Sequence, residues 1–195
     1  GLFIETGADS FACLVGQLLY RGAGGEEALR RYCTDLACDR LDHERIIGQF
    51  ALILKDECGL RLLTDPLGFF HVYFNEAAGV AASSFWALLE LLPMVTVEAA
   101  GIYEYAWNGT TFGGKTFVKE IRRLPAHAAI RFDSEMTLAR TATPRLLRSS
   151  SPTRMLDSYV DEHVERLRRL FGDLAAAFGD GLRVSFSSGY DSRLM

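Results

Sequence analysis

The sequence lacks a long apolar run and an excess of basic charge. No stretch approaches the roughly 20 apolar residues that a membrane-spanning helix needs, although 49 % of the 195 residues are hydrophobic. The formal net charge of −4 gives none of the positive footprint that nucleic-acid binding requires. No secretory signal is evident, because Glu5 and Asp9 interrupt the first apolar residues. These absences predict a cytoplasmic protein whose partners are neither membranes nor nucleic acids.

Cysteine and histidine are also scarce, with four of each. Cys33 and Cys38 are five residues apart, and the cysteines match no zinc-binding spacing. Cys13 lies in an apolar run and is expected in the core. The histidines are scattered. We therefore expect reduced structural thiols and no metal site.

The first 140 residues contain short apolar runs separated by turn residues. Strands are expected at 11–20, 48–56, 60–64, 71–74, 79–83, 128–132 and 136–141, and helices at 26–39, 84–92 and 98–107. The strand runs are nearly continuous, as is typical of strands covered on both faces. Hairpins followed by helices indicate an α+β fold.

The composition changes at about residue 142. Residues 143–153 are rich in Ser, Thr and Pro and predict a linker, in which Ser151 and Pro152 suit a helix start. Apolar residues then recur every three or four positions to Phe178, which predicts one amphipathic helix that needs a packing partner. The expected organisation is a domain at 1–142, a linker at 143–153 and a second segment at 154–195.

A short strand at 182–186 leads into Ser187-Ser188-Gly189-Tyr190-Asp191-Ser192. Small residues let the backbone N–H groups approach phosphate oxygens, and the hydroxyls of Ser187, Ser188 and Ser192 add donors. A helix that begins near Ser192 directs its positive end at the anion. The other interpretation is a serine-rich turn between a strand and a helix.

This loop resembles the Ser-Gly-Gly-x-Asp-Ser pyrophosphate loop of the N-type ATP pyrophosphatases, and within them the asparagine synthetase family. Ser188 stands where the family usually has glycine. The resemblance implies that Ser187, Ser188, Gly189, Asp191 and Ser192 bind the pyrophosphate of ATP. It also implies that the complete protein uses ATP and Mg²⁺ to adenylate a carboxylate before an amine attacks.

The first domain resembles the class II glutamine amidotransferase domain of the same family. The similar segments are Gly48-Gln49-Phe50-Ala51, Asp65-Pro66-Leu67-Gly68 with Tyr73, Ala82-Ser83-Ser84 to Leu88, and Asn108-Gly109 to Pro125 with Phe117, Ile121 and Leu124. Thr64 and Ser84 stand where the family has arginine and glutamate. The resemblance implies the four-layer αββα sandwich of the N-terminal-nucleophile hydrolases. The tail is then a helix and the first strand of an α/β nucleotide-binding domain.

The chemistry of that family is absent from this sequence. Glutamine hydrolysis there needs an N-terminal cysteine whose thiolate attacks the amide, and Gly1 has no nucleophile. The family's glutamine-binding arginine and Asn-Gly-Glu segments have no match before Gly48. We therefore expect no catalytic residue, no metal and no bound cofactor in this chain. A competing interpretation is that a catalytic segment preceded Gly1.

Two functional hypotheses remain. The first is the N-terminal part of an ATP-dependent amide-forming ligase, related to asparagine synthetase, β-lactam synthetase and lasso-peptide cyclases, whose partner is the missing synthetase domain. The second is a non-catalytic structural or dimerisation module. Such a module serves dimerisation or docks the synthetase domain. Aromatic residues concentrated at 69–70, 103–107 and Phe112 suit an interface of this kind, a possible homodimer included, although core packing is their default explanation. Asp65 is the best polar candidate of the first domain, and we expect it to brace the turn that follows.

Overall fold

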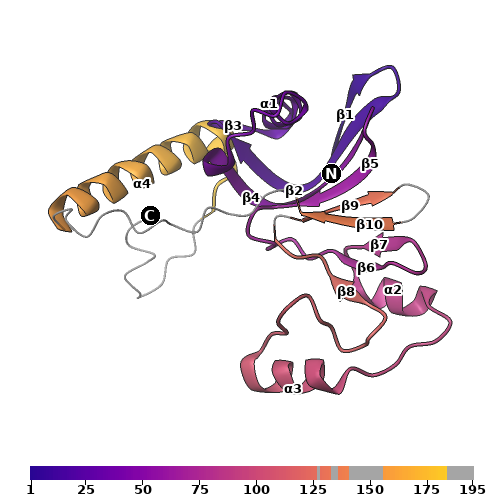
Figure 1. The fold of residues 1–195 in the computed structure, drawn as a ribbon. Helices are drawn as coiled ribbons and strands as arrows, with labels where there is room; N and C mark the ends of the chain where they lie inside the picture. Colours follow the sequence, from indigo (N-terminus) through magenta and orange to yellow (C-terminus); the bar gives the residue numbers. More distant parts are fainter. Residues whose placement is uncertain (127, 133–135, 141–155, 184–195) are drawn as a thin grey trace. The chain divides into compact units, whose positions relative to one another are not determined.

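The computed structural model describes residues 1–126, 128–132, 136–140 and 156–183 (Figure 1). Within them the chain is a mixed α+β protein with antiparallel sheets. It forms two compact units, one of Gly1–Gln17 with Ile47–Pro144 and the other of Leu18–Ile46 with Arg145–Met195. The predicted division at the linker 143–153 stays a prediction.

A large antiparallel sheet holds most strands of the described residues. Its order is β1-β2-β4-β5-β9-β10, and the short β3 pairs with the end of β2. Registered pairs include Leu2 with Leu14, and Leu62 with both Ile53 and Ile130. The strands are β1 (Leu2–Gly7), β2 (Ser10–Tyr20), β3 (Ala23–Gly24), β4 (Ile46–Asp56), β5 (Gly59–Thr64), β9 (Ala128–Phe132) and β10 (Met136–Arg140).

A second, smaller sheet packs against the large sheet in the first unit. Its order is β7 (Val80–Ala82), β6 (Tyr73–Asn75) and β8 (Arg122–Arg123). The core between the sheets joins Leu62 and Ile130 from the large sheet to Phe74 of β6. Tyr73, which points to the opposite face of β6, packs with Leu88 of α2 (Phe85–Leu91). The layers within this unit are therefore sheet, sheet and helix.

The expectation that the apolar strands are covered on both faces holds for only part of β4. Phe50, Ala51 and Leu52 are consecutive and buried, as expected for a strand covered on both faces. Ile53 is 37 % exposed. The strands of the second sheet are only two or three residues long, so this sheet does not extend far enough to cover Ile53.

The helix ends of the first unit follow their sequence signals. Ser84 caps α2 by accepting the N–H of Ala87 at 3.3 Å. Glu98 accepts the N–H of Ala100 at the start of α3 (Ala99–Asn108). Gly109 ends α3 with φ of 71°, the left-handed conformation that glycine adopts readily. The helices predicted at 84–92 and 98–107 are thus confirmed.

The second unit contains α1 (Gly25–Ala37), η1 (His43–Arg45), α4 (Leu156–Phe178) and η2 (Gly179–Gly181). Gly24 of β3 lies so close to α4 that an added Cβ would stand 3.0 Å from the Cβ of Ala177. At the other end of α4, Val160 and Val164 are 50 % and 38 % exposed. The predicted helix is confirmed, but its apolar face has a partner mainly at its C-terminal end.

Candidate functional site

The predicted pyrophosphate loop lies outside the described residues. This covers Ser187, Ser188, Gly189, Asp191 and Ser192, together with the strand from Val184, the linker 143–153 and the helix start at Ser151. Their roles therefore stay predictions, and the described part of the chain is where a site can be built.

Asp65 is the centre of the strongest polar site in the first unit. It directly follows β5 and is fully buried. One carboxylate oxygen accepts the N–H groups of Leu67 at 3.1 Å and Phe69 at 3.0 Å, and the other accepts that of Phe70 at 2.8 Å. The backbone N–H of Asp65 donates to the carbonyl of Phe50 in β4 at 3.0 Å. The carboxylate is thus occupied by the turn that follows it, and the expected bracing role is confirmed.

The segments that resemble the amidotransferase domain meet around this turn. Gln49 donates its side-chain amide to the carbonyl of Phe69 at 2.9 Å. The hydroxyl of Thr64 donates to the carbonyl of Pro125 at 3.4 Å. The N–H of Leu124 donates to the carbonyl of Val72 at 2.7 Å. Segments near residues 50, 65 and 125 therefore form one hydrogen-bonded junction, called here the Asp65 junction.

His71 lies at the edge of the Asp65 junction. Desolvation of its ring and the nearby Arg123 guanidinium lower the pKa of His71 from its ordinary value, and the Asp65 carboxylate opposes them. The imidazole edge faces Tyr73, with ring centroids 6.2 Å apart. The lowered pKa favours the neutral imidazole near pH 7, and the side chain is exposed.

Thr116 is a buried residue whose role the sequence analysis missed. Its hydroxyl lies 2.8 Å from the carbonyl of Val118 and 2.6 Å from that of Ile121, and it accepts the N–H of Val118 at 3.2 Å. These bonds hold the loop between α3 and β8. The available signal was its place one residue before Phe117 in the amidotransferase-like segment.

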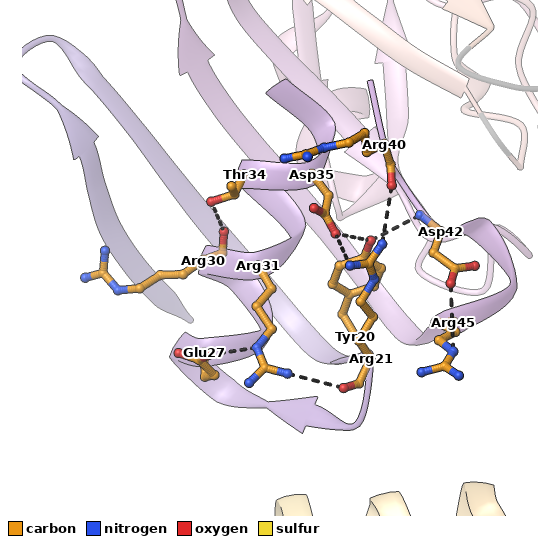
Figure 2. Close-up of polar contacts among 10 residues, drawn as sticks. All are labelled: Tyr20, Arg21, Glu27, Arg30, Arg31, Thr34, Asp35, Arg40, Asp42 and Arg45. Carbon is orange, nitrogen blue, oxygen red and sulfur yellow. Dashed lines mark hydrogen bonds and ion pairs between the residues drawn. The ribbon is translucent and has the colours of Figure 1, made fainter. Parts of the chain in front are cut away.

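The second unit contains a polar network centred on Tyr20, which the sequence analysis also missed (Figure 2). The buried Tyr20 hydroxyl donates to the Asp35 carboxylate at 2.7 Å and accepts the backbone N–H of Asp42 at 3.1 Å. Arg21 pairs with the same Asp35 oxygen at 3.1 Å. The Tyr32 ring of α1 packs edge-on against Tyr20 at 5.7 Å. The network therefore ties the end of β2 to α1 and to the segment before η1.

Burial raises the pKa of the Tyr20 hydroxyl above its ordinary value. The Asp42 N–H lowers it, the hydrogen bond and charge of Asp35 raise it, and the Arg21 charge lowers it. A buried phenol held neutral between these groups joins parts of the fold, and its two hydrogen bonds are made to residues of the second unit.

Tyr20→Phe tests this network. The loss of two hydrogen bonds is expected to lower the free energy of unfolding by about 1–2 kcal/mol at neutral pH. Because the folded-state pKa is raised, the stabilisation by the hydroxyl is complete below the ordinary tyrosine pKa of about 10 and is lost as pH rises through the folded value. The stability gap between wild type and variant, measured by urea denaturation, should therefore narrow in alkali. Tyr105→Phe, at a 51 % exposed position, is the control and should leave stability unchanged at neutral pH.

The cysteines fit the expected reduced thiols. All four lie in described residues and are free. Cys33 is buried in α1, whereas Cys13 is only half-buried, opposite Phe3 in the β1–β2 pair. The core position expected for Cys13 is thus wrong in degree, because its cross-strand neighbour Phe3 in the edge strand β1 is 58 % exposed and this face of the sheet is open there.

The fold and the Asp65 junction define a mixed α+β protein with two facing antiparallel sheets in its first unit. Compared with known protein families, the chain matches none, and no curated protein matches it. Among the described residues, every helix is too short or too polar to cross a bilayer. The same residues contain no cluster of His, Cys, Asp and Glu suited to a metal ion.

Proposed function

We propose that this chain is the N-terminal part of an asparagine-synthetase-like, ATP-dependent amide-forming ligase. Residues 1–142 serve in it as an amidotransferase-like domain that holds its fold without glutaminase chemistry. Residues 154–195 begin the domain that adenylates the substrate.

The Asp65 junction is the observation that carries this proposal. The segments that resemble the amidotransferase domain lie far apart in the sequence, yet those near Phe50, Asp65 and Pro125 are hydrogen-bonded to one another. The contact between Phe50 and Asp65 follows from the pairing of β4 with β5, and the bond from Thr64 to Pro125 brings a segment from much later in the sequence to the same place. The polar groups of the junction satisfy one another, which supports a retained scaffold over a reacting centre.

The nucleotide chemistry is assigned to the tail by resemblance. Ser187, Ser188, Gly189, Asp191 and Ser192 would hold the pyrophosphate of ATP, with Mg²⁺ as counter-ion. In this proposal the amine that attacks the adenylated carboxylate is free ammonia or an amine of the substrate.

Two enzyme assays and the determination of the coding sequence that follows Met195 test the proposal. The purified chain should release no glutamate from glutamine and should catalyse no ATP–pyrophosphate exchange, because the nucleophile and the rest of the ATP site are missing from it. Turnover in either assay contradicts the respective half of the proposal. The coding sequence after Met195 should continue into a helical domain. A stop codon in its place contradicts the ligase assignment.

The second candidate is a structural module without any ligase activity. The observation that favours it is the aromatic surface of α3, where Tyr103 and Trp107 are 75 % and 90 % exposed. The coding sequence after Met195 distinguishes the two candidates. A ligase needs a synthetase domain encoded there, whereas a structural module does not.

A further inference from the structure

Two arginines lie directly opposite each other on neighbouring strands of the large sheet. Arg61 of β5 is in register with Arg131 of β9. Residues in register in an antiparallel pair project from the same face, with Cβ atoms about 4.5–5.5 Å apart. Like charges directly opposite each other destabilise a sheet. This pair therefore requires negative groups beside it.

Asp56 satisfies Arg61 only in part. One carboxylate oxygen of Asp56 pairs with a terminal nitrogen of Arg61, and the other accepts the backbone N–H of Cys58 at 2.9 Å. The Nε of Arg61 is buried without a hydrogen-bond partner among the described residues. A guanidinium has five N–H donors, and buried donors without a partner are rare enough in proteins to require an explanation. Asp56 thus supplies fewer acceptors than Arg61 can use.

Arg131 adds a second guanidinium to the same face of the sheet. Its side chain is exposed, and no residue in the described part of the chain forms an ion pair or hydrogen bond with it. The next residue across the sheet is Thr137 of β10, which is in register with Arg131 and is also exposed. On the other side of Arg61, the registered residue of β4 is the buried Leu54. Two guanidinium groups and one hydroxyl, from Arg61, Arg131 and Thr137, therefore form a line across β5, β9 and β10, called here the Arg61 row.

The charge and the donors of the Arg61 row suit a phosphate group. The row stays positive when Asp56 is counted, since two arginines and one aspartate leave one positive charge. Its N–H and O–H donors outnumber what the two oxygens of a single carboxylate can accept. A phosphate group offers three oxygens and carries a charge of about −1.5 to −2 at neutral pH, and guanidinium groups bind it through paired N–H donors. Donor number and charge thus both favour phosphate over a carboxylate.

We propose that the Arg61 row binds a phosphate group, with the guanidinium groups of Arg61 and Arg131 on its oxygens and the hydroxyl of Thr137 as a further donor. The ligand is a small phosphate compound, either inorganic phosphate or a phosphate monoester. One bound anion contacts three neighbouring strands, so it stabilises this part of the large sheet against strand separation. The site lies within the first unit and shares no residue with the predicted pyrophosphate loop. The inference is therefore independent of the ligase proposal.

Thermal unfolding of the full chain at constant ionic strength tests the proposal, with chloride exchanged for inorganic phosphate. For a Kd of about 1 mM, about 20 mM phosphate should raise the Tm by about 4–7 °C. Arg131→Ala removes one guanidinium from an exposed position and should raise the Kd about tenfold or more, through the loss of charge-assisted hydrogen bonds. The matched control is Arg168→Ala, because Arg168 is a surface arginine of α4 whose side chain is 75 % exposed. This control should respond to phosphate as the wild type does.

Arg131→Glu gives a second test that a general loss of stability cannot imitate. The new carboxylate lies opposite Arg61, so this variant should have a higher Tm than the wild type in chloride and should no longer respond to phosphate. AMP in place of inorganic phosphate identifies the source of the group: tighter Arg131-dependent binding of AMP assigns a monoester, and weaker binding assigns the free ion. A Tm that phosphate raises no more than chloride or acetate does, an equal response in Arg131→Ala, or an Arg131→Glu variant less stable than the wild type overturns the proposal.

Discussion

Asp65→Ala is expected to lower the free energy of unfolding by about 4 kcal/mol, the cost of removing a charged acceptor from three part-buried hydrogen bonds. The N–H donors belong to Leu67, Phe69 and Phe70, and the fully buried carboxylate serves all three. Far-UV circular dichroism during urea denaturation measures the loss. The free energy of unfolding of a domain is usually about 5–15 kcal/mol, so the variant is expected to lose a large fraction of it.

The size of the effect should depend on how many N–H groups lose their acceptor. Asp65→Asn keeps an oxygen where Leu67 and Phe69 donate, and it loses the contact with Phe70, so about 1–2 kcal/mol is expected. Asp9→Ala, in the exposed turn between β1 and β2, is the control and should change stability by less than about 0.5 kcal/mol. An Asp65→Ala variant as stable as the Asp9→Ala variant would show that the turn holds its shape without the carboxylate.

The sequence was most informative where a local rule determines the structure. Ser84 begins α2 because its side chain can accept a helix N–H, and Gly109 ends α3 because it takes a left-handed conformation. The hairpin turn at Gly59 follows for the same reason, with φ of 97°. Each signal lies within a few residues of the structure that it predicts. Most strands and helices of the first 140 residues were therefore predictable, whereas the edge strand β1 and the two-residue strands β3 and β8 were not predicted.

The polar sites depend on contacts across the sequence, and they were only partly predictable. Tyr20 finds Asp35 fifteen residues away and Asp42 twenty-two residues away. No spacing rule relates these positions, since their contact depends on how α1 returns toward β2. Asp65 was identifiable because its bonds stay within five residues. Locality thus distinguishes Asp65 from Tyr20, but it is not sufficient, because Thr116 was missed although its bonds also stay within five residues.

Which side of α3 faces the protein could not be predicted from the sequence pattern. Periodicity places Tyr103 and Trp107 on one face, and an apolar face normally packs inward. The deciding contacts are Glu104 with Lys115 and Gly101 against Thr116, both made with the loop that follows the helix. These contacts fix the polar side inward. The default expectation that these aromatic residues pack in the core is therefore wrong for Tyr103 and Trp107, which are 75 % and 90 % exposed.

Gly16→Ala is expected to destabilise the first unit by about 3–5 kcal/mol through two separate effects. Gly16 lies in β2 with φ of 100°, a conformation that residues with a Cβ adopt at a cost. An added Cβ would also overlap the carbonyl oxygen of Gln49 and stand 2.9 Å from the Cα of Phe50. Both atoms belong to the backbone of β4, so relief requires the two strands to separate. Thermal and urea unfolding followed by circular dichroism measure the loss.

Gly59→Ala separates the two effects. Gly59 has a similar φ of 97°, but an added Cβ there meets nothing within 4 Å. This variant should lose only the conformational part, about 1–2 kcal/mol. The excess in Gly16→Ala then measures the close approach of β2 to Gln49 and Phe50, the strand that leads into the Asp65 junction. Equal losses in the two variants would mean that β2 can move away from β4 freely. The junction would then be held by the turn after Asp65, without support from the strand packing beside it.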